Sequence, residues 1–395
     1  MRSRIFGGLP REVAVLTAIS FSVAVGYGVI IPAIPLFARS FGVNNFQVGA
    51  VISLFAAMRF ASGLISGRLA DRFGERLTLS VGVAIVAISM FFSGLAHSYL
   101  ELLLFRAAGG IGSSMFTVAA GSLLLRVVES DQRGRAQSTY QSGFLIGGIM
   151  GPAIGGVLTE ISLRAPFFIY SASLIIAGVI SAIFLAQSRL SVPGVESSEN
   201  REESMKISQA LKLVPYQSAL LCSFALGWSI FGVRSSIVPL YVKSGLGQGG
   251  TLIGIGFTIA SIIGAIFLLP AGRIADSRGR RFTLIRGTSL MFIGLVVLTF
   301  LETPLFFIIA MGIMAAGASF TGSPAVAMVG DIIRGRGGQV IALYQMMNDL
   351  GSVIGPLIAG ALADAFGYRI SFISAIIILL PALIWVFKMT ETKRA

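Results

Sequence analysis

The sequence predicts an all-α integral membrane protein with 12 transmembrane helices, arranged as two pseudo-symmetric six-helix bundles. Of its 395 residues, 55% are hydrophobic and only 12% are charged, which leaves too little polar surface to cover a water-soluble protein of this length. Apolar runs of about 20 residues, long enough to cross a bilayer, recur along the chain. A Gly- and Arg-rich segment at residues 67–76 recurs at residues 272–281. Such a repeat indicates that a six-helix half was duplicated.

The first half is predicted to comprise residues 1–187. It begins with a short basic segment, Met1 to Arg11, followed by an apolar stretch that is longer than a signal-peptide core and has no small-residue cleavage pattern. We therefore expect this stretch to be retained as the first span. The six predicted spans are 13–37, 47–68, 78–96, 99–127, 136–159 and 165–186.

A polar stretch at residues 188–213, rich in Glu and Ser, separates the two halves and is predicted to be a cytoplasmic linker. The second half follows as residues 214–395. Its predicted spans are 217–241, 251–271, 282–301, 305–328, 340–362 and 370–387.

The positive charges predict the orientation in the membrane. A net charge of +13 would suggest nucleic acid as a partner of a soluble protein. Here most Lys and Arg residues gather at the termini, in the linker and in alternate loops, whereas the opposite loops hold only Arg39, Arg164, Lys243 and Arg369. The charge is therefore a topology signal. We expect a multi-pass protein of the cytoplasmic (inner) membrane with both termini in the cytoplasm, in contact with lipid and without a nucleic-acid partner.

The duplication extends beyond the repeated loop. The tripeptide Pro-Leu-Phe at 35–37 recurs as Pro-Leu-Tyr at 239–241. The pattern Tyr-Gln-x5-Gly-x3-Gly-Pro at 140–152 recurs with identical spacing at 344–356. Apolar helices that merely look alike would match in Leu and Ile but not in these residues.

These features resemble the major facilitator superfamily over essentially the whole chain. The segment 67–74 is similar to the family's Gly-x-Leu-Ala-Asp-Arg-x-Gly loop, and residues 102–112 resemble its fourth-helix signature around Arg106 and Gly110, with Gly109 where that signature often has Gln. Residues 147–156 resemble the fifth-helix signature of the drug:proton antiporter branch, through the residues Gly147, Gly151, Pro152, Gly155 and Gly156. The resemblance implies a major facilitator fold and a monomeric secondary transporter that works by alternating access. It further implies proton-coupled export of amphipathic small molecules or drugs.

The two repeated loops are the candidate gates. In a turn at the membrane face, glycine would serve the backbone and arginine would meet lipid phosphate. The resemblance places Asp71 near the N-terminus of the span 340–362, where a carboxylate would latch the halves together. The alternative is a solvated loop that serves only to set the topology. The segment also departs from the family pattern at Glu75, where the family usually has a basic residue. The gate residues are Gly67, Asp71, Arg72, Gly74, Arg76, Gly272, Asp276, Gly279 and Arg280.

Glycines recur every four residues in the span 136–159, from Gly143 to Gly155, and therefore share one helix face. A smooth glycine face allows another helix to approach closely in lipid. We expect the partner to be the span 251–271, which has its own small residues at Gly254, Gly256 and Gly264. Ordinary close packing, with no bearing on transport direction, is the alternative.

Four charged residues lie well inside predicted spans, more than five residues from either end: Arg59, Arg106, Arg234 and Asp349. Such residues are costly in lipid and are therefore candidates for function. At ~1.5 Å per residue, Arg59 and Asp349 fall near mid-membrane, and the resemblance makes their helices neighbours. We expect the two to pair and to couple transport to the proton, with Asp349 as the carrier. A salt bridge that only locks packing is the alternative.

Other polar residues are candidates for lining a substrate cavity, although each could equally serve helix packing: Tyr27, Tyr140, Gln141, Trp228, Arg234, Tyr344, Gln345 and Asn348. If Arg59 and Asp349 neutralise each other, Arg106 and Arg234 leave a positive potential that would attract anions or neutral polar molecules.

An enzyme is disfavoured by the sequence. The single Cys222 and single His97 offer neither a disulfide framework nor a Cys or His metal cluster, so we expect no metal and no cofactor other than the coupling proton. Two alternatives stay open: a transporter or facilitator of an anionic or neutral metabolite without proton coupling, and a non-transporting receptor or lipid scramblase.

Overall fold

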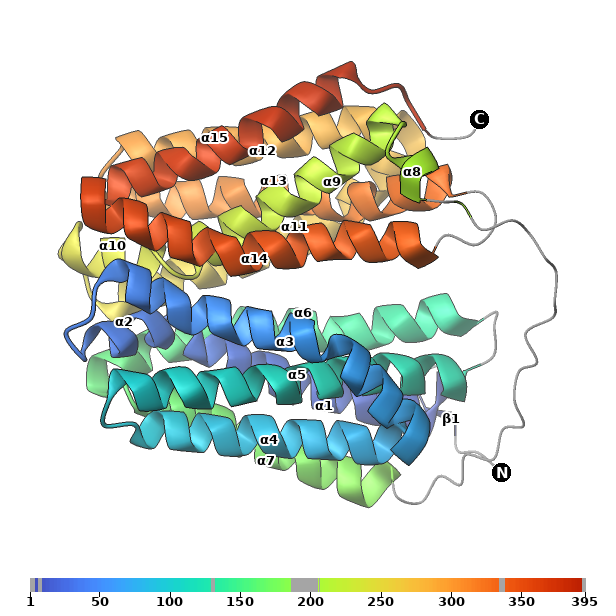
Figure 1. Ribbon diagram of the computed structural model, residues 1–395, viewed down its shortest axis with the longest axis vertical. Helices are drawn as coiled ribbons and strands as arrows, with labels where there is room; N and C mark the ends of the chain where they lie inside the picture. Colours follow the sequence, from blue (N-terminus) through green and yellow to red (C-terminus); the bar gives the residue numbers. More distant parts are fainter. Residues whose placement is uncertain are drawn as a thin grey trace. The chain divides into compact units, whose positions relative to one another are not determined.

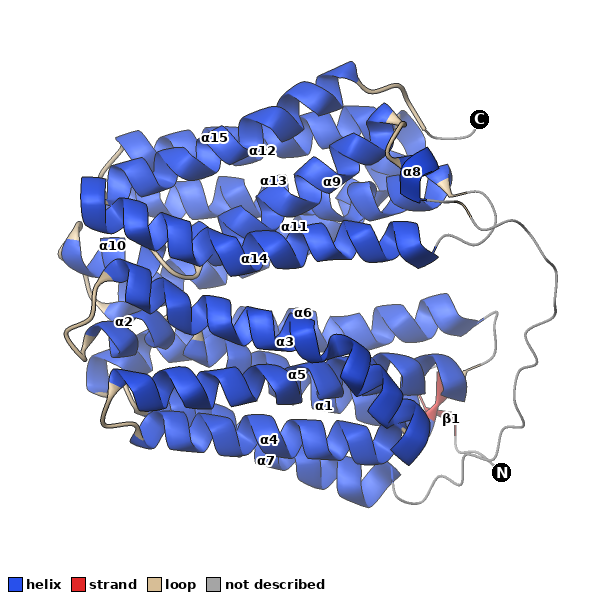
Figure 2. Ribbon diagram, viewed as in Figure 1, coloured by secondary structure: helices blue, strands red, loops and turns tan. Residues whose placement is uncertain are grey.

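The computed structural model describes residues 4–5, 9–128, 132–185, 205, 207–333 and 338–392. These residues are helical apart from short connections and one pair of two-residue strands, β1 (Arg4–Ile5) and β2 (Leu9–Pro10), which pair antiparallel (Figure 2). The chain forms two compact units. Unit 1 comprises Met1–Val43 and Ala50–Val195, and unit 2 comprises Asn44–Gly49 and Glu196–Ala395.

Unit 1 is built around two helix pairs. The helix α1 packs against α6 and α7, and α4 packs against α5 and α7 (Figure 1). Its helices are α1 (Arg11–Ile30), α2 (Ala33–Arg39), α3 (Asn45–Phe73), α4 (Glu75–Leu95), α5 (Tyr99–Val127), α6 (Arg133–Ile161) and α7 (Ala165–Leu185). The first residues of α3, up to Gly49, are assigned to unit 2.

Unit 2 repeats this packing. The segment formed by α9 and the π-helix η2 packs against α14 as α1 packs against α6, and α12 packs against α13 and α15 as α4 packs against α5 and α7. Its elements are α8 (Ile207–Ala210), α9 (Val214–Gly227), η2 (Trp228–Arg234), α10 (Val238–Ser244), α11 (Gly250–Arg278), α12 (Arg280–Phe300), α13 (Pro304–Ile332), α14 (Gly338–Phe366) and α15 (Tyr368–Lys388).

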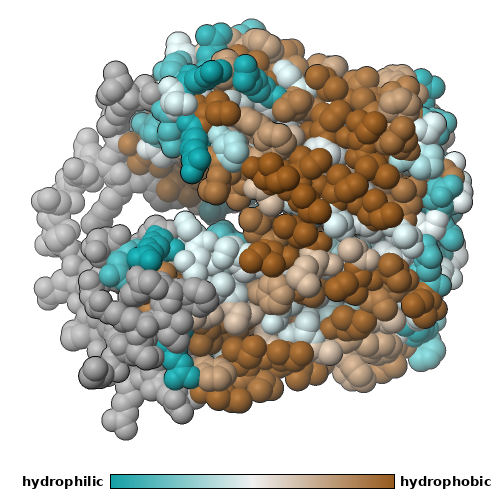
Figure 3. All heavy atoms as spheres, turned by 180° about the vertical axis from the view of Figure 1, so that it is seen from behind, coloured by the Kyte–Doolittle hydropathy of each residue, from teal (hydrophilic) through white to brown (hydrophobic). Residues whose placement is uncertain are grey.

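The predicted spans are confirmed. In the described part of the chain, 11 helical segments are long and apolar enough to cross a membrane, with α9, η2 and α10 counted as one, and α7 is apolar over the shorter stretch Ala165–Ser181. Large apolar side chains such as Leu64, Ile161 and Leu269 are exposed on the helix surfaces, and Figure 3 shows such side chains covering much of one face. Apolar exposure of this extent is what a lipid solvent permits.

The helices extend beyond the apolar runs, which corrects the prediction of a turn over residues 67–76 and 272–281. Residues 67–73 continue α3, and residues 272–278 continue α11. The chain reverses at Gly74 (φ 88°) and Gly279 (φ 103°), a backbone region that favours glycine. A helix satisfies its own backbone hydrogen bonds, so it can continue into charged sequence after the apolar run has ended.

The predicted linker 188–213 lies mostly outside the described residues. Its described part contains the short helix α8 and the connection to α9.

Candidate functional site

The glycine face of α6 packs against α1 inside unit 1. A Cβ on Gly147 would lie 2.8 Å from the Val25 amide nitrogen, and one on Gly151 would lie 2.6 Å from the Gly28 Cα. The prediction that this face packs against the span 251–271 is therefore wrong. That span forms part of α11, whose Gly256 faces Phe307 of α13. Small residues have brought two helices of the same bundle together.

The same contact recurs in unit 2 between α14 and the α9–η2 segment. Gly351 and Gly355 of α14 face the backbones of Trp228 and Gly232. A matched hydrogen bond accompanies each contact. In unit 1 the Ser20 hydroxyl donates to the Tyr140 carbonyl oxygen at 3.0 Å. In unit 2 the Ser223 hydroxyl donates to the Tyr344 carbonyl oxygen at 2.8 Å.

The candidate cavity residues are divided between the units, so the cavity itself stays a prediction. Tyr140 and Tyr344 are buried at the helix contacts just described. Asn348 donates from its side-chain nitrogen to the Ser223 carbonyl oxygen at 3.1 Å. The remaining candidates are placed as follows: Tyr27 and Arg234 are half-buried, Trp228 is buried, and Gln141 and Gln345 are exposed.

Arg106 is a buried cation inside unit 1, with 3% of its surface exposed. Its guanidinium lies 4.3 Å from the centre of the Phe55 ring, and its Nη1 lies 3.6 Å from the Met90 sulfur. It has no ion pair with a carboxylate in the described part of the chain, so the aromatic ring supplies a cation–π contact instead. Gly110 of the same helix faces the Phe55 carbonyl oxygen, which lets α5 approach α3.

Arg59 and Asp349 lie in different units. Arg59 is exposed on α3 of unit 1, and Asp349 is half-buried on α14 of unit 2, so their pairing stays a prediction. Asp349 is nevertheless distinctive. In the described residues it is the only carboxylate more than two turns away from both ends of its helix.

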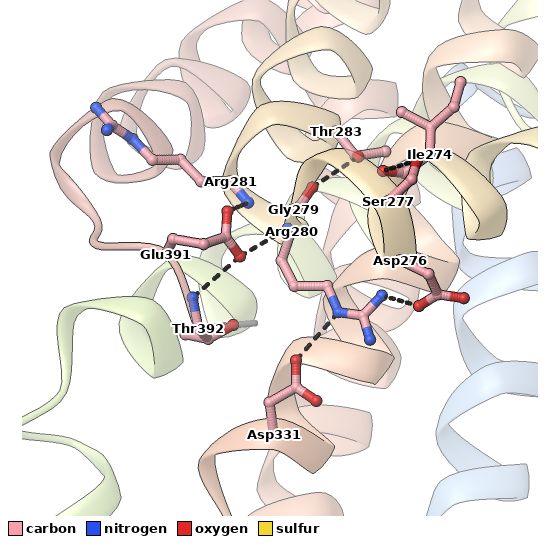
Figure 4. A network of polar contacts seen from close by, with 10 residues as sticks. All are labelled: Ile274, Asp276, Ser277, Gly279, Arg280, Arg281, Thr283, Asp331, Glu391 and Thr392. Carbon is pink, nitrogen blue, oxygen red and sulfur yellow. Dashed lines mark hydrogen bonds and ion pairs between the residues drawn. The ribbon is translucent and has the colours of Figure 1, made fainter. Parts of the chain in front are cut away.

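The second gate segment forms a charged network at the junction of α11 and α12 (Figure 4). The Arg280 guanidinium contacts Asp276 of α11 and, at 3.0 Å, Asp331 of α13. The Glu391 carboxylate accepts from the backbone N–H groups of Arg280 and Arg281 at 2.8 and 3.0 Å. A carboxylate suits this position because the first N–H groups of a helix have no partners within the helix.

The first gate segment carries the corresponding pair with the charges exchanged. The side chain of Glu75 is 6% exposed and lies 2.8 Å from Arg126, which is half-exposed. Glu75 is equivalent to Arg280, and Arg126 to Asp331, because each pair of positions is separated by 205 residues, as the two gate segments are. This ion pair was not predicted from the sequence. Its signal was an exchange of charge between equivalent positions, from Glu75 to Arg280 and from Arg126 to Asp331.

The remaining gate residues have simpler surroundings. Asp71 and Arg72 are exposed, with the Arg72 guanidinium over the Phe73 ring at 5.3 Å. Gly67 and Gly272 are helical and have open space where a side chain would project. The latch between Asp71 and the N-terminus of α14 stays a prediction, because they belong to different units.

Cys222 is a free, buried thiol. In the described ranges, no group of three or more His, Cys, Asp or Glu side chains is arranged to hold a metal ion.

Comparison with known proteins accounts for this architecture. The chain matches the family model described as Major Facilitator Superfamily over residues 16–247 and 219–395. It is 26% identical over 359 residues to the quinolone resistance protein NorA of Staphylococcus aureus (strain COL), covering 90% of each protein. It is 25% identical over 387 residues to an uncharacterised transporter of Methanocaldococcus jannaschii, covering 94% of this chain and 97% of that protein. Its fold is similar to that of a bacterial homologue of the human lysosomal transporter Spinster, with a TM-score of 0.81, 18% identity and 96% coverage of each chain.

Proposed function

The chain belongs to the major facilitator superfamily, and from that premise we propose that it exports amphipathic small molecules in exchange for protons. As a member of a transporter family with many apolar helices, it is a multi-pass membrane transporter rather than an enzyme. Its substrate is a small molecule.

The direction and the substrate class are supported by the relatives. Proteins whose name records resistance to quinolones align with 90% of this chain, and resistance to a drug is what an exporter provides. The glycine and proline pattern of α6 agrees with this assignment, because it resembles the signature of exporters. With both termini in the cytoplasm, as the basic loops indicate, the substrate leaves the cytoplasm as protons enter.

Proton coupling depends on one observation, the position of Asp349 in the middle of α14. A carboxylate far from the helix ends is expensive in a membrane unless it is protonated, paired or hydrated. Alternating access changes its surroundings, so its proton affinity differs between the two states of the cycle. A nearby Arg59 would favour the charged form in one of them.

The test is transport by purified protein in proteoliposomes, with and without a pH gradient. Asp349→Asn should abolish accumulation driven by the gradient but preserve counterflow exchange, because exchange needs no net proton movement. Glu302→Gln is the matched control, since Glu302 is exposed in the loop between α12 and α13. Full pH-driven accumulation by the Asp349 variant would show that this residue has a structural role only.

A second candidate is a transporter or facilitator of an anionic or neutral metabolite that uses no proton. The buried guanidinium of Arg106, which has no ion-paired carboxylate among the described residues, favours it. Because such a protein would carry substrate equally well without a pH gradient, the same proteoliposome measurement distinguishes the two candidates.

A further inference from the structure

Two arginines lie over one aromatic ring where α11 meets α12. The guanidinium carbon of Arg278 is 5.5 Å from the centre of the Phe282 ring, and that of Arg286 is 4.0 Å from it. Arg278 is the last residue of α11, and Arg286 lies in the second turn of α12. The three residues therefore form one cluster that bridges the reversal of the chain at Gly279. We call it the Arg–Phe–Arg cluster.

The two positive charges of the cluster have no acidic partner in the described part of the chain. Neither Arg278 nor Arg286 makes an ion pair with a carboxylate there, and both side chains are exposed. The acids of the neighbouring network contact Arg280 and backbone N–H groups instead (Figure 4). The cluster therefore presents a positive charge at the surface of unit 2.

Arg286 lies on a face of α12 that points away from the core of unit 2. Arg286, Ile293 and Phe300 follow one another at intervals of seven residues, which is close to two helical turns, and so they share this face. Ile293 and Phe300 are exposed apolar side chains, as is typical of a helix face in contact with lipid. The cluster is therefore continuous with a lipid-facing surface.

The depth of the cluster agrees with the level of lipid headgroups. At the other end of the same face, Arg369 lies 4.7 Å from the centre of the Phe300 ring. Phe282 and Phe300 are 18 residues apart, a rise of about 27 Å, and the hydrocarbon core of a bilayer is about 30 Å thick. Helix side chains point back toward the N-terminus, so the Arg286 guanidinium reaches the ring of Phe282 at the membrane boundary.

Unit 1 shows the same face without the cluster. The equivalent positions, 205 residues earlier, are Phe73, Leu77 and Val81. Leu77 and Val81 are exposed apolar side chains on α4. An apolar residue is therefore sufficient for this fold at these positions, and helix packing does not account for the arginines of unit 2.

A phosphate group matches the chemistry of the cluster. Guanidinium groups bind phosphate oxygens through paired, charge-assisted hydrogen bonds. A zwitterionic headgroup would also bring an ammonium group toward two guanidinium groups, which repel it. A headgroup with a net negative charge fits better, and the apolar face beside the cluster would contact its acyl chains.

We propose that Arg278, Phe282 and Arg286 form a binding site for the headgroup of an anionic phospholipid, whose acyl chains lie along the exposed face of α12. A lipid bound there would join the end of α11 to the start of α12. The site does not depend on the substrate or the ion that the protein transports.

Native mass spectrometry of the detergent-purified protein, titrated with single phospholipids, measures this binding. Phosphatidylglycerol, which has a net negative charge, should bind about tenfold more tightly than zwitterionic phosphatidylethanolamine. Arg278→Gln and Arg286→Gln should each weaken binding of phosphatidylglycerol about fivefold, the effect of one basic residue near an anionic surface. Binding of phosphatidylethanolamine should not change.

The controls separate a site from a general response to charge. Arg369→Gln removes the same charge from an arginine that lies over a phenylalanine without a second arginine in the described residues, and it should change the affinity less than twofold. Arg286→Val copies Val81 of unit 1, so it should fold and lose the binding even where a Gln variant does not fold. An excess of inorganic phosphate should not displace the lipid, because the acyl chains contribute to its binding.

Equal affinity for the two lipids would overturn the proposal, as would a loss in Arg369→Gln as large as in Arg286→Gln. Displacement by inorganic phosphate would mean that the cluster binds the free ion, which also overturns it. The acidic linker residues are the competing occupant by charge: Glu196, Glu199, Glu202 and Glu203. Binding of phosphatidylglycerol that appears only after all four are replaced by Gln would assign the cluster to the linker and exclude the lipid.

Discussion

Single residues decide how the two gate segments hold together. Glu75–Arg126 and Arg280–Asp331 occupy equivalent positions with opposite polarity, so this position accepts an ion pair in either order. Arg126→Gln should therefore lower the thermal stability of the purified protein, because it leaves the buried Glu75 carboxylate without this partner. The loss should be on the order of 3 kcal/mol at most, since Arg126 is half-exposed.

The exchanged double variant, Glu75→Arg with Arg126→Glu, should recover most of the unfolding temperature, because unit 2 demonstrates that geometry. Arg68→Gln is the control, as Arg68 is exposed on α3 of the same unit. A double variant no more stable than Arg126→Gln would mean that the exchange is tolerated in unit 2 alone.

A second prediction at this scale concerns Arg59 and Asp349. If they pair, Arg59→Ala leaves an uncompensated charge, and the single variant should be less stable than the double variant Arg59→Ala with Asp349→Asn. Thermal unfolding of the three proteins in detergent measures the coupling. Strictly additive effects would show that the two side chains do not interact.

Among the helices, the contact between α1 and α6 allows a matched test. A Cβ on Gly155 would collide with the Val29 backbone, whereas one on Gly148 would meet nothing within 4 Å. Gly155→Ala should therefore lower the unfolding temperature by several degrees, because overpacking costs about 1–3 kcal/mol. Gly148→Ala on the same helix should have no effect. Equal behaviour of the two variants would contradict the packing described for unit 1.

The π-helix η2 contains one residue more than the corresponding part of α1, because Gly147 and Gly151 face Val25 and Gly28, whereas Gly351 and Gly355 face Trp228 and Gly232. This extra residue suggests a deletion. Unit 1 makes the same glycine contacts with one residue fewer, so removal of Ile230 should turn η2 into an α-helix without displacing Gly232 from Gly355. We expect the shortened protein to insert into the membrane and to unfold at a similar temperature, which thermal unfolding of the purified protein measures. A protein that fails to fold would show that the π-turn is needed for packing.

The sequence predicts the spans well and their partners poorly, for a physical reason. Burial in lipid requires long apolar runs, so the length and number of spans can be read directly. A glycine face shows that some helix approaches closely but carries no information on which one, and the α6 face was assigned to the wrong helix for that reason. The π-turn left only a one-residue change of spacing, which becomes visible once the structure pairs the glycines.

For the whole molecule, orientation is the property still to be measured. In a Cys222→Ala background, cysteines at Ser197 and Ser277 should react with a membrane-impermeant reagent only after the cells are opened. Cysteines at Ser98 and Ser244 should react in intact cells. Reaction of the Ser197 variant from outside would reverse the orientation inferred from the basic loops.

The duplication predicts two like units, and the structure shows them with the same internal helix pairs. The candidate site is predicted less completely. The residues within one unit, such as Ser223, Tyr344 and Asn348, can be placed by their contacts. The pairing of Arg59 with Asp349 and the latch of Asp71 depend on residues from both units, and they stay predictions.

The changed spacing at η2 also orders two events in the history of the gene, the duplication of the half and the gain or loss of one residue. The sequence repeat indicates that both halves descend from one ancestral half, which implies that the residue was gained or lost after the duplication. A relative whose first and seventh spans keep a single spacing throughout would have branched off before that event. The presence or absence of this residue therefore groups relatives by whether they diverged after or before the event, independently of their sequence identity.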